Sequence, residues 1–157
     1  MQSLLSITPG TDSPHNFFLF KENPVSIKAP GEKIKILMVD DDRKDIQLFQ
    51  DLLAGESRFL FSLQAFTNPT EALYYLEKMA KPEDFPDVMI TDLVMPETNG
   101  KMLLRYLKTA HQTEHLPIIV HSSMNNHSNI TYIREFQACA FFEKPLNAEA
   151  FVNYLTS

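Results

Sequence analysis

The chain has 157 residues, of which 44% are hydrophobic, and its 14 lysine and arginine side chains stand against 20 aspartate and glutamate side chains, a formal net charge of −6. This length and composition suit one folded domain and exclude wholesale disorder. The acidic balance argues against direct binding to nucleic acid, and no apolar run approaches the ~20 residues that cross a bilayer. Cys139, the single cysteine, permits no internal disulfide. Because the start of the chain also lacks a secretion signal, we expect a soluble cytoplasmic protein with no membrane contact.

Residues 1–32 differ in composition from the rest of the chain. They hold four prolines and two glycines and show no helical periodicity, so we expect an irregular N-terminal extension here. The exception within it is the apolar cluster Phe17-Phe18-Leu19-Phe20. These side chains either fold back onto the domain, which we favour, or make a contact between molecules.

From Lys33 onward, short apolar runs alternate with stretches whose apolar residues recur at helical spacing. The apolar runs predict five strands, at 34–39, 59–66, 88–91, 118–121 and 140–142. A predicted helix follows each strand: Gly55 closes the first, Asn68 caps the second and Asn147 caps the last. The alternation therefore predicts a single α/β domain over 33–157, in which right-handed βαβ units form a parallel sheet with helices on both faces.

Polar side chains follow most of the predicted strands. Three aspartates, 40–42, come after the first strand, Asp92 after the third, Ser122 after the fourth and Lys144 after the fifth. The second strand ends without a charged residue, which indicates an outer position in the sheet. Because ligands of open α/β sheets bind beyond the carboxyl ends of the strands, we expect these side chains to form one site.

The charges of this expected site favour a divalent cation. The carboxylates of Asp40, Asp41 and Asp92 would raise one another's pKa and destabilise the fold unless a cation lay among them. Mg²⁺ suits a few carboxylates, a carbonyl and several waters. Lys144 offers an ammonium group and Ser122 a hydroxyl group to phosphoryl oxygens. Since a carboxylate can accept a phosphoryl group as a mixed anhydride, the residues favour phosphoryl transfer to an aspartate.

Four stretches carry these residues in a fixed order: Val39-Asp40-Asp41-Asp42, Pro86 to Pro96 with Asp92 inside it, Leu116 to Ser122, and Phe141-Phe142-Glu143-Lys144-Pro145. Together they resemble the receiver domain of response regulators in two-component signalling, including the family's spacing of the aspartate, the hydroxyl and the lysine. The resemblance covers about residues 33–157. It implies a flavodoxin-like, doubly wound sheet of five parallel strands in the order 2-1-3-4-5, with five helices in a single domain.

The resemblance also implies how the site binds its metal and its phosphoryl group. Asp92 corresponds to the phosphoacceptor. Asp41 corresponds to a direct Mg²⁺ ligand, Asp40 helps to hold the metal, and the backbone carbonyl of Val94 corresponds to a further protein ligand. Lys144 corresponds to the family's phosphoryl-binding lysine, and the resemblance implies that its peptide bond to the following proline is cis.

The function that this resemblance implies is signalling. A sensor histidine kinase or a histidine phosphotransfer protein would pass a phosphoryl group to Asp92. Ser122 would then hydrogen-bond to the new group and Phe141, at the aromatic switch position, would rotate inward. The face formed by the fourth helix, fifth strand and fifth helix would thereby change its binding to a downstream protein or to a second copy in a homodimer. We therefore expect a stand-alone phosphoprotein that promotes its own aspartyl phosphorylation and dephosphorylation and is otherwise no enzyme.

Two apolar side chains bear on the lifetime of the phosphorylated state. Val94 and Met124 stand two residues after Asp92 and Ser122, at positions that influence hydrolysis in the family. Because neither side chain can orient a water molecule, we predict a long-lived phosphoryl group on Asp92.

Three competing interpretations remain. A haloacid-dehalogenase-type phosphatase uses an aspartate, a hydroxyl, a lysine and Mg²⁺, but its nucleophile ends the first strand and an acidic pair follows the lysine, and here Glu149 stands alone. A degenerate receiver would be a pure interaction module that is never phosphorylated. His111 and His115 lie four residues apart, yet the spacing falls across a predicted helix end, so we do not expect a zinc site.

Overall fold

The computed structural model describes residues 17–21, 32–57, 59–79, 81–93, 100–110, 113–123 and 127–156, and within them strands alternate with helices. The strands are β1 (Phe17–Leu19), β2 (Lys33–Val39), β3 (Leu60–Phe66), β4 (Val88–Thr91), β5 (Ile118–Ser122) and β6 (Ala140–Glu143). The helices are α2 (Arg43–Ala54), α3 (Pro69–Glu77), α4 (Gly100–Thr109), α5 (His127–Glu135) and α6 (Ala148–Thr156), with a 3₁₀ turn η1 (Pro82–Asp84). Each of the five predicted strands is present, with ends that differ by at most one residue.

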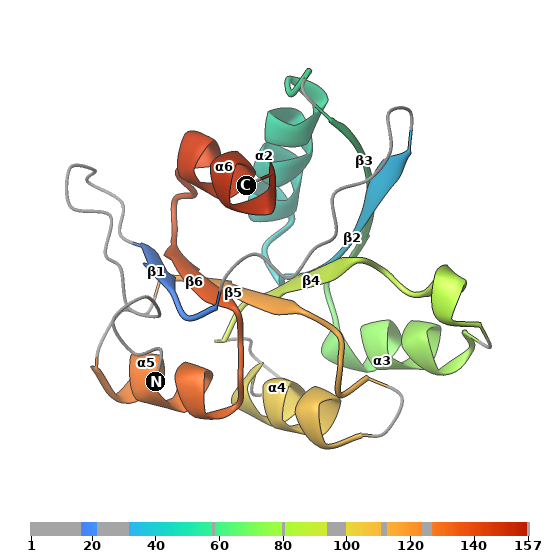
Figure 1. The fold of residues 1–157 in the computed structure, drawn as a ribbon, viewed down its shortest axis with the longest axis vertical. Helices are drawn as coiled ribbons and strands as arrows, with labels where there is room; N and C mark the ends of the chain where they lie inside the picture. Colours follow the sequence, from blue (N-terminus) through green and yellow to red (C-terminus); the bar gives the residue numbers. More distant parts are fainter. Residues whose placement is uncertain are drawn as a thin grey trace.

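The strands form one sheet in the order β1-β6-β5-β4-β2-β3. The five strands from β2 to β6 pair in parallel, which confirms the expected flavodoxin-like, doubly wound fold. β3 lies at one edge of the sheet, as its uncharged end indicated. The predicted number of strands is wrong, because the sheet has a sixth strand: β1 pairs with β6 in the antiparallel direction (Figure 1).

The sixth strand lies within the segment that we expected to be an irregular extension. Phe17, Phe18 and Leu19 pair with Phe142, Phe141 and Ala140. The aromatic cluster therefore folds back onto the domain, the interpretation that we favoured. Patterns of apolar residues predict structure only from the local sequence. Because β1 is only three residues long and is stabilised by its partner strand, the local sequence did not identify it.

Two apolar clusters pack the faces of the sheet. In Figure 1, α2 and α6 cover one face and α3, α4 and α5 cover the other. Alternate residues of β2 divide between them: Ile36 and Met38 belong to the cluster under α2 and α6, and Leu37 and Val39 to the cluster on the opposite face. Successive side chains of a strand point to opposite faces of the sheet, and here both faces are buried. The same alternation continues into the residues just beyond each strand end.

The predicted caps Gly55, Asn68 and Asn147 are present, and Asp42 is a further cap at the start of α2. Asp42 begins α2, where its side chain accepts a hydrogen bond from the Lys44 amide, and Gly55 ends that helix. The Asn68 side chain accepts hydrogen bonds from two amides in the first turn of α3. Asn147 caps α6 by accepting a hydrogen bond from the Ala150 amide at 3.1 Å. These caps satisfy amides that have no partner within the helix, and they fix where each helix leaves the sheet.

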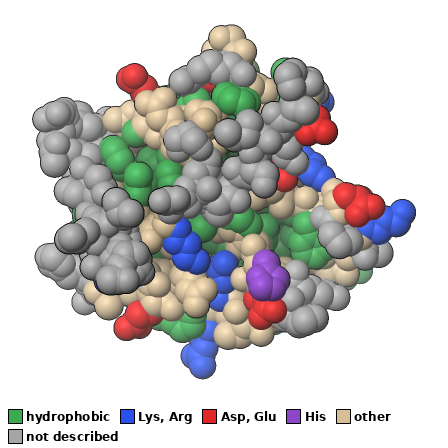
Figure 2. All heavy atoms as spheres, viewed as in Figure 1, with side chains coloured by type: hydrophobic (Ala, Val, Ile, Leu, Met, Phe, Trp, Pro, Cys, Tyr) green, Lys and Arg blue, Asp and Glu red, His purple; other side chains and the backbone are tan. Residues whose placement is uncertain are grey.

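The surface agrees with the composition. On the face shown in Figure 2, both acidic and basic side chains of the described residues reach the surface. Within the part of the chain that the structure describes, no helix combines the length and the apolar character that a membrane crossing requires.

Candidate functional site

The expected site residues lie at neighbouring strand ends, where backbone hydrogen bonds continue the sheet by one residue. The Asp40 amide donates to the Phe66 carbonyl at 3.0 Å, and the Asp92 amide donates to the Val39 carbonyl at 3.2 Å. On the far side of β5, the Lys144 amide donates to the Ser122 carbonyl at 3.0 Å. The sheet itself therefore holds the backbone of these residues, so their side chains start from fixed positions.

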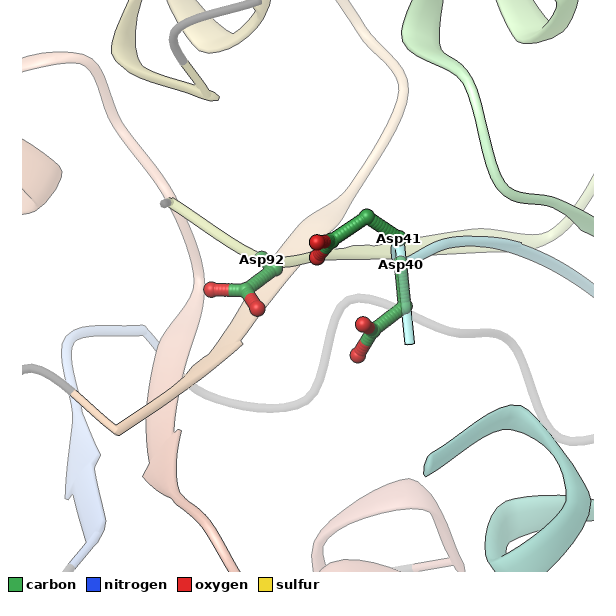
Figure 3. Close-up of side chains that lie close together, drawn as sticks. All are labelled: Asp40, Asp41 and Asp92. Atoms are coloured by element: carbon green, nitrogen blue, oxygen red, sulfur yellow. The ribbon is translucent and has the colours of Figure 1, made fainter. Parts of the chain in front are cut away.

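Three carboxylates gather at the ends of β2 and β4. Asp40, Asp41 and Asp92 each offer an oxygen, and these oxygens all lie within 4.8 Å of one another. Asp40 is 1% exposed and Asp92 is 6% exposed, whereas Asp41 is exposed at the rim. Figure 3 shows the three side chains close together where the two strands end. Oxygen donors at this separation, buried on one side and open to water on the other, fit a hard divalent cation such as Mg²⁺.

Lys144 lies within the same group of charges. Its Nζ atom is 2.8 Å from Asp92 Oδ2, 2.9 Å from Asp40 Oδ2 and 2.7 Å from Asp45 Oδ2. The peptide bond from Lys144 to Pro145 is cis, as the resemblance implied. The ammonium group thus joins the candidate acceptor to two further carboxylates, and it compensates only part of their negative charge.

Asp45 is a site residue that was not predicted from the sequence. It stands in the first turn of α2, three residues after the capping Asp42. Side chains in a first turn point back toward the helix N-terminus, which here faces the carboxyl ends of the strands. That position was the signal that could have found Asp45, because strand ends alone do not reveal a residue that a helix supplies.

The pKa values reflect this crowding. Burial raises the pKa of Asp40 to about 6, although the hydrogen bond and charge of Lys144 and the Asp42 amide oppose the shift. Burial alone would lower the pKa of Lys144, but its hydrogen bonds to the three carboxylates outweigh that effect and hold the pKa above its ordinary value. Lys144 therefore stays charged, and a further cation beside Asp40 would favour the ionised form of its carboxylate.

Ser122 and Phe141 lie beneath this charged group. Ser122 ends β5 and is fully buried, and Phe141 in β6 is fully buried as well. Phe141 pairs with Val120 across the sheet, two residues before Ser122. The candidate hydroxyl and the candidate switch aromatic therefore stand on adjacent strands, close enough for a change at one to reach the other.

His121 is a buried neighbour of the site. The last residue pair between β4 and β5 is Thr91 with Val120, and His121 follows it by one residue, which places it beside Asp92. It is 5% exposed, and neither Nδ1 nor Nε2 has a hydrogen-bond partner among the residues that the structure describes. Burial, followed by the charge of Lys144, lowers its pKa to about 4, so the imidazole is neutral at pH 7.

Some predicted residues lie outside the described part of the chain. These are Val94, the expected carbonyl ligand, Met124 and His111. His115 lies in an exposed turn and pairs with Glu114 at 3.4 Å. Among the described residues, the three aspartates form the one group of this kind that could hold a metal ion.

Comparisons with known proteins agree with this geometry. Residues 36–156 match the family model of the response regulator receiver domain. The chain is 34% identical over 119 residues to the chemotaxis protein CheV2 of Helicobacter pylori, an alignment that covers 75% of this chain and 36% of CheV2. The chain thus corresponds to about a third of that relative's length.

Solved structures of the same fold include two response regulators. The phosphorylated cyanobacterial phytochrome response regulator RcpA superimposes with a TM-score of 0.66 at 24% identity, over 80% of this chain and 90% of that one. The Mn²⁺-bound form of response regulator Rcp1 superimposes with a TM-score of 0.64 at 21% identity, over 78% of this chain and 88% of that one.

Proposed function

This chain belongs to the family of response regulator receiver domains, and we propose that it accepts a phosphoryl group on Asp92 from a phosphohistidine of a sensor kinase or a phosphotransfer protein. The observation that carries this proposal is that Asp92 lies next to both the other two carboxylates and the Lys144 ammonium group. Its carboxylate lies within 4.8 Å of the Asp40 and Asp41 oxygens, and its Oδ2 atom is 2.8 Å from the Lys144 ammonium. Since receiver domains are signalling proteins, the product is a changed binding surface rather than a released metabolite.

The proposed transfer moves one phosphoryl group. An Asp92 carboxylate oxygen forms a bond to phosphorus while the bond from phosphorus to the donor imidazole nitrogen breaks, and that imidazole leaves with the electron pair. Mg²⁺ held by Asp40, Asp41 and Asp92 would neutralise charge on the phosphoryl oxygens. Lys144 holds its positive charge beside Asp92, where a phosphoryl oxygen can replace one of its carboxylate partners.

The signal is proposed to leave through β6. A phosphoryl group on Asp92 draws a hydrogen bond from the Ser122 hydroxyl, and the backbone of β5 then shifts toward the site. Phe141, on the adjacent strand, moves with it, and the surface formed by α5, β6 and α6 changes shape. We propose a downstream protein or a second copy of the chain as the partner on that surface, and we place the exchange in the cytoplasm.

Two features argue against a phosphatase. The candidate nucleophile follows β4 rather than the first strand of the parallel sheet, and Glu149, which follows the lysine, is exposed in the first turn of α6. A steady-state assay with a generic phosphomonoester separates the two functions, because a receiver is labelled once and a phosphatase turns over.

The proposal is tested with acetyl phosphate and Mg²⁺. We expect intact-protein mass spectrometry to detect one phosphoryl group per chain, and no label when EDTA removes the metal. Asp92→Asn, which preserves the shape of the side chain, should abolish labelling. The matched control is Asp51→Asn, on the exposed side of α2, which should be labelled like the unmodified chain. An unlabelled native chain, the outcome for a degenerate receiver, or a label that persists in Asp92→Asn would overturn the proposal.

A further inference from the structure

The segment Phe17–Lys21, which we name the N-terminal strap, binds along the edge of β6. Its first three residues form β1, paired antiparallel with β6 (Figure 1). The next two amides, of Phe20 and Lys21, donate to the Cys139 carbonyl at 2.9 and 3.1 Å. The Tyr154 hydroxyl of α6 donates to the Lys21 carbonyl at 3.0 Å. The strap is therefore fixed to the strand, to the turn before it and to the helix after it.

Aromatic side chains hold the strap on both faces of the sheet. On one face, the Phe17 ring stacks on Phe142, with centroids 5.4 Å apart and an interplanar angle of 15°. On the other face, the Phe18 ring lies 6.2 Å from the ring of Phe141. Phe20 is 5% exposed and belongs to the same apolar cluster as Phe141. The strap thus contacts the candidate switch residue directly.

The two faces hold the strap unequally. On the α6 side, a pocket of about 390 Å³ lies beside Phe17 and Leu19, lined further by Ala150, Asn153 and Tyr154 of the helix. On the opposite side, Phe18 and Phe20 pack with the apolar cluster under α3, α4 and α5. Phe17 and Leu19 also pack against the apolar cluster on the α6 side, but Phe20 is the strap side chain that is buried in the core, so the Phe141 side holds the strap more deeply.

Without the strap, β6 would be an edge strand. Its outward amides and carbonyls would lack partners, and such an edge pairs readily with another extended segment. Phe141 would also lose the ring that covers it on the strap side. The strap occupies this edge in the way that a bound peptide occupies it, by backbone pairing with alternating side chains on two faces.

We propose that the β6 edge is a docking surface for an extended aromatic segment, that the strap is its resident occupant, and that phosphorylation of Asp92 weakens strap binding through Phe141. This inference rests on the proposed function. Movement of the Phe141 ring toward Ser122 carries it away from Phe18, so the strap loses contacts on the side that holds it best. By linkage, a strap that binds the unphosphorylated form more tightly also opposes the phosphorylated form.

The test measures amide hydrogen exchange in the full chain, with and without Mg²⁺ and beryllofluoride, which mimics a phosphoryl group on an aspartate. We expect the Phe20 and Lys21 amides to exchange about tenfold faster in the loaded protein. The α3 amides, which lie away from the strap, should not change. In Asp92→Asn, beryllofluoride should alter neither set of amides.

Two aromatic substitutions in the same strap sharpen the test. Phe18→Ala removes the ring that contacts Phe141 and should tighten beryllofluoride binding about fivefold, by the reciprocity of the coupling. Phe17→Ala removes a ring of the same size from the opposite face of the sheet, and its effect on beryllofluoride binding should be clearly smaller.

The outcomes distinguish the strap from the proposed function. If the protein loads beryllofluoride but the strap amides keep their exchange rates, or if Phe18→Ala leaves the affinity unchanged, the strap inference is wrong and the proposed function stands. If the native chain does not load at all, both are wrong.

Discussion

Strand β6 connects two regions of opposite chemistry. At its carboxyl end, Lys144 joins buried carboxylates in a group of charges that hold one another in place. Along its edge, Phe141 and Phe142 receive the aromatic rings of the strap. Lys144 is the third residue after Phe141 in the chain. Charge interactions stabilise the first region, whereas ring packing and backbone pairing stabilise the second. Because both lie on the short strand β6, a change in the charged region can reach the strap.

The two regions therefore respond to a bound group in different ways. In the charged region, a single added group such as a cation or a phosphoryl group strongly changes the electrostatic energy of the site, because charges interact strongly where the carboxylates are buried. In the aromatic region, binding is the sum of many weak contacts and a few backbone hydrogen bonds. A strong local event therefore lies next to a surface that is held weakly enough to respond to it.

The largest effect should follow from removing the ammonium group. In Lys144→Met, buried Asp40 and Asp92 lose their compensating charge, so the free energy of unfolding should fall by about 4 kcal/mol. Mg²⁺ should then stabilise the variant more than it stabilises the unmodified chain, because the ion replaces the missing charge. Urea unfolding with and without Mg²⁺ measures both effects.

The control for this substitution is Lys44→Met, which removes an exposed ammonium group in the first turn of α2. Its unfolding free energy should change by less than about 1 kcal/mol. A Lys144→Met variant that is as stable as the native chain without Mg²⁺ would contradict this account of the charged region.

A slightly smaller effect should follow in the aromatic region. Phe20→Ala removes a side chain that is almost fully buried in the core, and it should lower the free energy of unfolding by about 3 kcal/mol. Leu60→Ala, at the opposite edge of the sheet, removes a half-exposed side chain and should cost much less. Equal losses in thermal or urea unfolding would mean that the strap is not part of the folded core.

The smallest of these effects depends on pH. The His121 pKa is lowered to about 4 in the folded protein, so between pH 6.5 and pH 4 the unfolded chain binds a proton that the folded chain does not. Stability is therefore lost as the pH falls through this window. From pH 7 to pH 5, the native chain should lose on the order of 1–2 kcal/mol more than His121→Leu does.

Asp40 does not disturb that comparison. Its raised pKa, about 6, gives the opposite sign, since the folded chain takes up the proton first as the pH falls. This contribution is common to both proteins and cancels in the difference. His115→Leu, which replaces a histidine that is 93% exposed, is the control and should keep the pH dependence of the native chain. Identical pH dependence of the native chain and His121→Leu would show that His121 is not the group responsible.

The sequence predicted the parallel sheet and the convergence of Asp40, Asp92 and Lys144 for a simple reason. Apolar runs mark buried strands, and the carboxyl ends of neighbouring parallel strands meet at one edge. The structure adds Asp45 to the site, and it shows that His121, whose place next to Ser122 in the sequence indicated the pocket rim, is buried beside it. Asp45 reaches the site from a helix, and the role of His121 depends on the neighbour that pairing of β4 with β5 brings beside it.

The strap was harder to predict than the charged region. Its aromatic residues indicated that the segment is buried against another surface. A strand of three residues, however, is too short to show the alternation of apolar and polar residues that predicts a strand. Pairing with β6 joins residues more than a hundred positions apart, and local propensity carries no information about such a partner. Charge clusters can be inferred from strand ends, whereas edge pairing depends on the assembled sheet.

We expect that the carboxylates at the ends of β2 and β4 are tolerated together because they hold a divalent cation. Isothermal titration of the full chain with Mg²⁺ tests it most directly. We expect one ion to bind per chain, and binding at least about tenfold weaker in Asp41→Asn, which removes an exposed carboxylate oxygen without opening the core. An absence of binding to the native chain, or equal affinity in Asp41→Asn, would contradict the account.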